Sequence, residues 1–141
     1  MTQLWRPVVD HCRYEVSEDG EIRHVKTKKI RKLQAHKVAP HYLVVTIWDL
    51  AAGKLVLLRV HQEVAKAFVP RGTEHQRCVL HVNDIKHDNR AKNLVWGTHK
   101  ENTQMAIKNG RLCTGEQWQA SHHERLSRMR AGSKLLDGLR N

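Results

Sequence analysis

The sequence predicts an α+β fold, in which a small antiparallel N-terminal sheet is followed by a strand, loop, strand and helix unit and then by a helical basic tail. Residues 1–60 hold short extended runs separated by turn residues, and residues 61–69 change to the spacing of an amphipathic helix. Residues 78–110 return to two extended runs around a polar loop and end in a capped helix. We therefore divide the chain into 1–60, 61–110 and a tail, 111–141.

Two hairpins are predicted in the first sixty residues. Tyr14–Val16 and Glu21–Val25 flank an Asp-Gly turn, which between two extended runs is a strong hairpin signal. Tyr42–Trp48 and Lys54–Val60 are two stronger strands on either side of a short loop. One small antiparallel sheet is the simplest arrangement for these strands.

The elements of the second part follow in order. His61–Val69 has helical spacing and ends before Pro70, because proline cannot continue a helix. Cys78–Val82 and Asn93–Gly97 are extended, and the residues between them form a polar loop. Two short strands around a loop are therefore predicted.

Capping signals define the last helices. Thr98 and Glu101 have the spacing of a capping box, and Gly110 stands where a helix that runs to Asn109 would end. A second capping box at Ser121 opens a short helix in the basic tail.

The composition favours a polyanionic partner. The chain of 141 residues has 25 Lys and Arg against 14 Asp and Glu, which gives a formal net charge of +11. The charge is also clustered, since Arg23–Lys37 contains basic residues and no acidic one. Solubility is the alternative explanation of the charge, and nucleic acid explains the clustering better.

Cysteine spacing and hydropathy exclude several classes of protein. Cys12, Cys78 and Cys113 lie far apart, so that neither a zinc motif of C-x-x-C type nor a secreted disulfide framework is expected. No apolar run approaches the roughly 18 residues of a membrane span, and the N-terminus lacks the regions of a signal peptide. We expect a cytoplasmic protein with no membrane partner and no small-molecule substrate.

Three polar residues of the second part could carry chemistry. His81 ends the first predicted strand, Asn93 opens the second, and Asn102 lies in the first turns of the helix. An imidazole of ordinary pKa near 6.5 suits a general base, and an amide oxygen suits a hard cation such as Mg²⁺, which commonly takes one or two protein ligands. On spacing alone, residues of these types are more often surface polar groups.

A family resemblance adds to this pattern. Val79–Asp84, Asp88–Thr98 and Lys100–Asn102 resemble the HNH motif of phage homing endonucleases. Trp5–Val8 with Tyr14–Arg23 looks like the NUMOD4 module that accompanies this motif, and the segment from Val60 to Phe68 resembles the helix that joins the two.

The resemblance implies a ββα-metal fold for residues 78–110 and cleavage of double-stranded DNA that depends on one Mg²⁺ or Mn²⁺ ion and leaves a 5′ phosphate and a 3′ hydroxyl. It implies His81 as the base, Asn93 as its orienter and Asn102 as a metal ligand. The chain departs from many relatives at Leu80, where an acid or amide would supply a second ligand. Asp84 could replace that ligand, and Asp88 or water could do so equally.

Phosphate contacts are predicted from the basic stretch and from the loop, since such contacts position a protein on DNA without reading its sequence. The residues concerned are Lys26, Lys28, Lys29, Arg31, Lys32, Arg90 and Lys92. The chain would nick one strand as a monomer or cut both as a dimer. The alternatives are a DNA-binding HNH protein that has lost turnover, and an RNA-binding protein, which would leave the order of His81, Asn93 and Asn102 unexplained.

Overall fold

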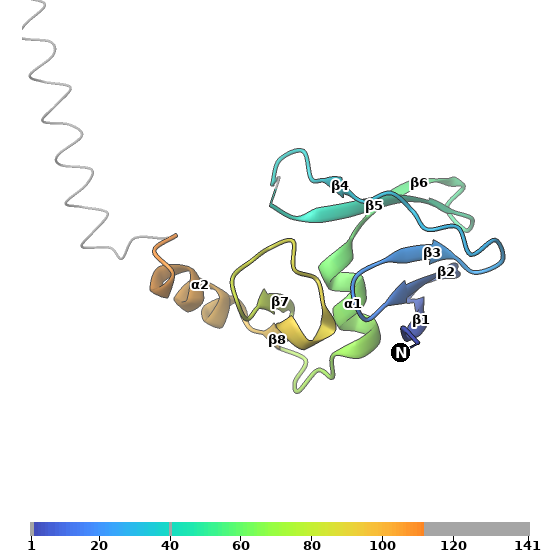
Figure 1. Ribbon diagram of the computed structural model, residues 1–141. Coiled ribbons are helices and arrows are strands. Elements are labelled where there is room, and N and C mark those ends of the chain that lie inside the picture. Colours follow the sequence, from blue (N-terminus) through green and yellow to red (C-terminus); the bar gives the residue numbers. More distant parts are fainter. Residues whose placement is uncertain (1, 40, 112–141) are drawn as a thin grey trace, which may run out of the picture. The chain divides into compact units, whose positions relative to one another are not determined.

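The structure, a computed structural model, describes residues 2–39 and 41–111 and has the predicted α+β class (Figure 1). In chain order its elements are β1 (Trp5–Val8), β2 (His11–Ser17), β3 (Ile22–His24), β4 (Gln34–Ala35), β5 (Leu43–Asp49), β6 (Lys54–Arg59), α1 (Val60–Phe68), β7 (Cys78–His81), η1 (Ala91–Asn93), β8 (Leu94–Gly97) and α2 (His99–Lys108).

The N-terminal region forms two three-stranded sheets, so the prediction of a single sheet is wrong. One sheet has the order β1-β2-β3 and the other β4-β5-β6, and all neighbouring strands are antiparallel. Between β3 and β4 lies an isolated bridge, Arg23 to Ile30, and the lysines of this stretch are exposed. The short strand β1 was not predicted, since it contains Pro7 and its register with β2 shifts after that residue.

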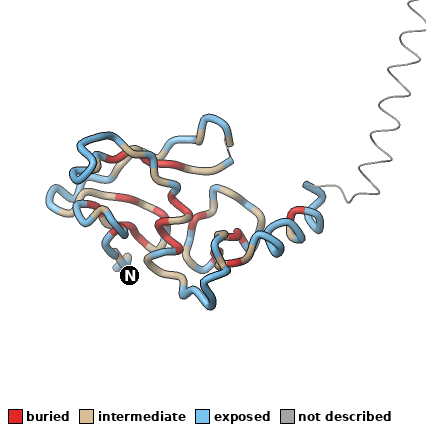
Figure 2. The backbone as a smooth tube through the Cα atoms, turned by 180° about the vertical axis from the view of Figure 1, so that it is seen from behind, coloured by how far each residue is buried: buried red, intermediate tan, exposed pale blue. Residues whose placement is uncertain are grey.

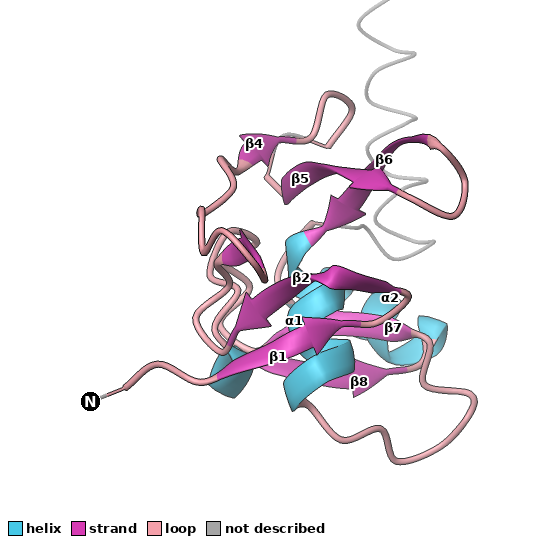
Figure 3. Ribbon diagram, turned by 90° about the vertical axis from the view of Figure 1, so that its right-hand side faces the viewer, coloured by secondary structure: helices cyan, strands magenta, loops and turns pink. Residues whose placement is uncertain are grey.

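Helix α1 is the centre of the core. It packs against strands of both N-terminal sheets and against β7, β8 and η1 (Figures 1 and 3). Val60, Val64 and Ala65 on α1 are fully buried, as are Val16 and Ile47 on the two sheets. A fully buried Val or Ile side chain contributes about 1.5–3 kcal/mol. The buried parts of the backbone gather around this helix and the strands beside it (Figure 2).

The second part follows the predicted order of strand, loop, strand and helix. β7 pairs with β8 in an antiparallel register that places His81 opposite Leu94. The capping box is present, because Thr98 N donates to Glu101 Oε2 over 2.6 Å and Glu101 N donates to Thr98 Oγ1 over 3.2 Å. Gly110, with φ of +70°, follows the end of α2 as predicted.

The contacts divide the chain after Asn102, so the stretch 103–111 is considered by itself, as the second half of α2 and its C-terminal turn. Almost all of the predicted tail, residues 112–141, lies outside the described residues. None of the helices in the described part of the chain is long and apolar enough to cross a membrane.

Candidate active site

His81 is the last residue of β7, and none of its surface is exposed. Its Nε2 lies 3.2 Å from Oδ1 of Asn89, which is also buried. Because an amide oxygen only accepts hydrogen bonds, Nε2 carries the proton of the ring and Nδ1 keeps a lone pair. Nδ1 has no hydrogen-bond partner among the described residues. The ring is therefore oriented through one nitrogen and can act as a base through the other.

Burial lowers the pKa of His81 below its ordinary value of 6.5, and the nearby Lys86 cation acts in the same direction. The hydrogen bond to Asn89 and the charges of Asp88 and Asp84 oppose this shift. The net result is a neutral imidazole at pH 7, which is the form that can accept a proton.

Two further rings pack on His81. The centroid of the His61 ring lies 5.3 Å from that of the His81 ring. The centroid of the Tyr42 ring lies 5.0 Å from that of His61 and 6.1 Å from that of His81. His61 stands in the first turn of α1 and is 5 % exposed. Burial, together with the neighbouring His81, lowers the pKa of His61 to about 3. His61 therefore packs directly against the ring of His81 and supports it from the side of α1.

Asn93 ends η1, directly before β8, and its carboxamide forms hydrogen bonds with the loop between β7 and η1. Its Nδ2 donates to Asn83 Oδ1 and to the backbone oxygen of Asp88, each over 2.9 Å. Its Oδ1 accepts from Asn83 N over 3.1 Å, and its backbone oxygen accepts from Val82 N over 2.8 Å. The carboxamide thus holds the loop, while the direct hydrogen bond to the His81 ring comes from Asn89.

Asp88 and Arg90 stiffen the same loop. Arg90 Nε and an Arg90 terminal nitrogen donate to the two carboxylate oxygens of Asp88, each over 2.7 Å, and Asn83 Nδ2 also donates to this carboxylate, over 2.8 Å. The Arg90 guanidinium holds the pKa of Asp88 well below its usual range. Asp88 is therefore engaged in the loop and is a poorer candidate for a metal ligand than Asp84.

The two candidate ligands have different surroundings. The half-buried Asp84, with φ of +59°, forms an ion pair with Lys86, whose Nζ lies 2.8 Å from Oδ1. Asn102 is exposed in the first turns of α2, and its backbone N–H donates to Thr98 O over 3.0 Å. Within residues 2–39 and 41–111, no three His, Cys, Asp or Glu side chains gather as a metal site. A carboxylate oxygen and an amide oxygen are the kinds of ligand that a hard cation such as Mg²⁺ takes, one or two from the protein and the rest from water and phosphate.

Leu80 contributes to the core. The side chain is 6 % exposed, and its Cδ1 lies 2.5 Å from the position that a Cβ on Gly97 would take. Leu80 therefore occupies the space that Gly97 leaves open on the neighbouring strand.

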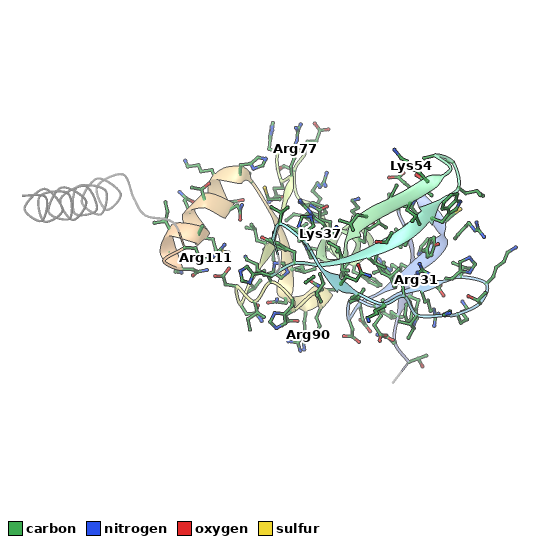
Figure 4. All side chains as sticks on the ribbon, turned by 90° about the horizontal axis from the view of Figure 1, so that it is seen from above. Arg31, Lys37, Lys54, Arg77, Arg90 and Arg111 are labelled. Atoms are coloured by element: carbon green, nitrogen blue, oxygen red, sulfur yellow. The ribbon has the colours of Figure 1, made fainter. Side chains whose placement is uncertain are left out.

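The predicted DNA-contact residues fall into two groups. Lys28 is bound to Glu15 over 2.7 Å, Arg31 donates to the backbone oxygen of Thr46 over 3.1 Å, and Arg90 is bound to Asp88. The ammonium groups of the other four are exposed and have no ion pair with a described residue: Lys26, Lys29, Lys32 and Lys92. Arg31 and Arg90 emerge from different segments of the chain (Figure 4).

Sequence reasoning missed three neighbours of His81, namely Tyr42, Lys86 and Asn89. Asn89 belongs to a polar loop, where no periodicity distinguishes a buried side chain from an exposed one. Tyr42 is 39 positions away in the sequence, and only the packing of β5 beside α1 brings it to the site. A buried carboxamide could have been suspected only from the density of Asn and Asp in the loop.

Comparison with known proteins gives consistent matches. The NUMOD4 motif matches residues 4–48. The HNH endonucleases L247 and L245 of Acanthamoeba polyphaga mimivirus are 32 % and 29 % identical over 111 and 110 residues, which are 77 % and 78 % of this chain. The chain spans only 27 % and 32 % of the lengths of these two relatives.

Two other matches extend over more of both partners. YosQ of Bacillus subtilis (strain 168), whose name describes an HNH homing endonuclease derived from the SPbeta prophage, is 32 % identical over 136 residues, covering 94 % of this chain and 73 % of the relative. The solved structure of I-HmuI, an HNH homing endonuclease that binds and cleaves DNA, matches with a TM-score of 0.68 and 28 % identity. That match covers 86 % of this chain and 68 % of the other.

Proposed function

Since this chain belongs to the HNH homing endonuclease family, we propose that it is a DNA endonuclease that hydrolyses phosphodiester bonds in double-stranded DNA. The observation that carries the proposal is the state of His81, whose Nε2 is bonded to Asn89 while Nδ1 has no protein partner among the described residues. A general base needs this arrangement, because one nitrogen fixes the ring and the other accepts the proton.

In the proposed reaction, Nδ1 of His81 accepts a proton from the attacking water as the water oxygen bonds to phosphorus. The bond to the 3′ oxygen then breaks, and this oxygen takes a proton from solvent water, which leaves a 5′ phosphate and a 3′ hydroxyl. Because the ring is fully covered in the free protein, water can reach Nδ1 only when a covering group such as Tyr42 is displaced. Binding of DNA beside the ring is the natural occasion for this displacement.

We assign the roles around His81 as follows. Asn89 orients the base directly, and Asn93 orients it through the loop whose ends it joins. His61 supports one side of the ring and stays uncharged at neutral pH, since its pKa is lowered to about 3 by burial. It therefore adds no positive charge to the base it touches.

Asn102 and Asp84 are the residues that we propose would hold one divalent cation, Mg²⁺ or Mn²⁺. Both offer oxygen ligands, which hard cations prefer, and the exposed Asn102 side chain leaves room for water and phosphate oxygens beside it. When bound, the ion would stabilise the negative charge on the leaving 3′ oxygen. Lys86 neutralises Asp84 in the absence of such a cation.

We propose that DNA is held mainly through its phosphates, with the exposed Lys26, Lys29, Lys32 and Lys92 as the readiest contacts. The chain would nick one strand as a monomer or cut both strands as a homodimer. We also retain the division of the chain after residue 60 and residue 110 as a proposal about its modules.

The second candidate is a DNA-binding HNH protein without turnover. The burial of Leu80 favours it, because this side chain cannot ligate a metal ion and the Asp84 carboxylate is already paired with Lys86. The two candidates share the basic surface and differ only in catalysis.

A plasmid assay distinguishes the two candidates. Supercoiled DNA is incubated with the full chain in Mg²⁺, in Mn²⁺ and in EDTA, and DNA binding is measured in parallel. Conversion to nicked or linear DNA in either metal and none in EDTA supports the nuclease, and the ends are then tested for a 5′ phosphate. Binding without conversion in either metal supports the second candidate.

A further inference from the structure

The turn between β2 and β3 is tight, and a buried serine lies at its start. Gly20 N donates to Ser17 O over 3.1 Å, Ser17 N donates to Glu21 O over 2.9 Å, and Ser17 Oγ accepts from Glu21 N over 3.0 Å. Ser17 is completely buried, and Gly20 has φ of +94°, a backbone conformation that residues other than glycine rarely adopt. Three hydrogen bonds therefore close the turn, and a glycine occupies the position with positive φ.

This turn contacts the loop that carries Asn89. A Cβ on Gly20 would lie 2.9 Å from the Cβ of Asn89, 3.5 Å from the backbone oxygen of Asn89 and 3.6 Å from Val60 Cγ1. Two residues further along, Ala91 N donates to Glu18 O over 2.7 Å. The two sides of Asn89 thus have different neighbours, the N-terminal turn at its Cβ and His81 Nε2 at its side-chain oxygen.

We propose that the β2–β3 turn is a positioning element for the general base, in which Gly20 acts on His81 through Asn89. The inference rests on the proposed function and adds to it a task for the N-terminal region besides any contact with DNA. Gly20 is a positioning residue, since it touches neither the base nor the substrate.

The contacts explain why a small change in the turn would affect the base. The bond from His81 Nε2 to Asn89 Oδ1 is 3.2 Å long, which is at the upper end of the range for N–H···O bonds. Asn89 cannot retreat freely, because it is 4 % exposed and the chain is held two residues later by the Ala91 bond. A displacement of a few tenths of an ångström at the Asn89 Cβ would weaken the bond and release the His81 ring.

The test compares two glycines in turns of positive φ. Gly20→Ala places a Cβ against Asn89, whereas Gly53→Ala, at φ of +62° in the turn between β5 and β6, meets nothing within 4 Å. Single-turnover nicking at saturating DNA should be about tenfold slower or more in G20A and unchanged in G53A. DNA affinity should be unchanged in both variants, because the contact made by Gly20 affects the orientation of His81 and not the binding of DNA.

Two more variants keep the proposal testable if G20A fails to fold. Ala91→Pro removes the N–H that binds Glu18 O, and proline fits there because Ala91 is the first residue of η1 and Arg90 has φ of −62° and ψ of +136°. It should also slow nicking. Asn89→Asp keeps an acceptor for Nε2 and should retain far more activity than Asn89→Leu, which a merely space-filling role for Asn89 does not predict.

A spectroscopic readout separates this proposal from the proposed function. The ¹⁵N chemical shifts of His81 in the free protein report which ring nitrogen carries the proton. We expect the Nε2–H form in wild type and G53A, and a mixture of forms in G20A, or in A91P if G20A does not fold. A folded variant with wild-type shifts and wild-type nicking would overturn the positioning role. A wild-type chain that shows the Nε2–H form but never cleaves would overturn only the nuclease function.

Discussion

The core around α1 and the loop of residues 82–92 are stabilised by different interactions. Aliphatic side chains of the helix and of both sheets are buried together, such as Val64 on α1, Val16 on β2 and Ile47 on β5, and the stabilisation follows from apolar area removed from water. In the loop, carboxamides and carboxylates such as those of Asn93 and Asp88 bind backbone and side-chain groups. Apolar packing has no direction, whereas hydrogen bonds do. The comparison shows that His81 is oriented by a directional hydrogen bond from the polar loop, whereas the rings of His61 and Tyr42 cover it.

His81→Ala should have the largest effect, because it removes the group at the boundary of the two regions. Loss of a positioned base costs about 10²–10⁴-fold in rate, while DNA affinity should change little, since the ring is buried and acts on water. Single-turnover cleavage and a binding titration measure the two quantities. His75→Ala, at an exposed residue, is the control. Equal losses of cleavage and affinity would contradict the assignment.

Leu80→Asp tests the apolar side of the same boundary. An unpaired carboxylate would be buried against Gly97, so we expect a loss of several kcal/mol of stability rather than a new metal ligand. Val95→Asp is the matched control, because Val95 pairs with Leu80 across the strands but is 40 % exposed. Thermal melting with and without Mg²⁺ distinguishes a destabilised fold from a new metal ligand. A stable L80D variant with tighter Mg²⁺ binding would show that position 80 can face the metal.

Asn102→Ala tests the proposed metal ligand on the exposed helix. Removing a residue that only hydrogen-bonds to a metal ligand typically costs about 10- to 100-fold in metal affinity. Losing the ligand itself should raise the Mg²⁺ concentration for half-maximal cleavage by at least as much. Excess Mn²⁺ should restore part of the rate. The measurement is a metal titration of nicking, with melting temperature as the control, since an exposed side chain should cost little stability. An unchanged titration curve would exclude Asn102 as a ligand.

His61→Phe should make the core less sensitive to acid. The folded pKa of His61 is about 3, whereas the unfolded residue titrates near 6.5, so below pH 6.5 the unfolded state takes up a proton that the folded state does not. Stability is therefore lost as the pH falls through this window, by about 2 kcal/mol between pH 6.5 and 5. Denaturant unfolding of wild type and H61F at both pH values measures the difference. The prediction fails if the two proteins lose the same stability over this interval.

Neutralising the exposed lysines should have the smallest effect, a change in the salt dependence of DNA affinity. Replacing Lys26, Lys29 and Lys32 by Ala should reduce the slope of log affinity against log salt by about 0.9 for each phosphate contact removed. Lys28→Ala is the comparison, because this ammonium is already bound to Glu15, whose pKa it lowers. Its slope should change less. A slope that is unaffected by the triple change would make these lysines solvent-facing groups without a DNA contact.

Most elements of the fold were predictable from local patterns. The hairpin after Tyr14, the strands β5 and β6, helix α1 and the capping box of α2 all follow from residue periodicity and turn signals, and the structure confirms them. The number of sheets was not predictable, because no local signal says whether β4 joins β2 and β3 or a separate ladder. Strand β1 was missed, since its proline argues against a strand.

By itself, the sequence determined the order His81, Asn93 and Asn102, the family that this order indicates, and the absence of an acid at Leu80. Only the tertiary structure decided which groups surround the base. Asn89 forms a hydrogen bond with His81 Nε2, and the rings of Tyr42 and His61 pack on the His81 ring. The turn at Gly20 lies against Asn89. The physical reason is that residue type and spacing set local conformation, whereas a hydrogen bond between distant side chains depends on how separate elements pack around α1.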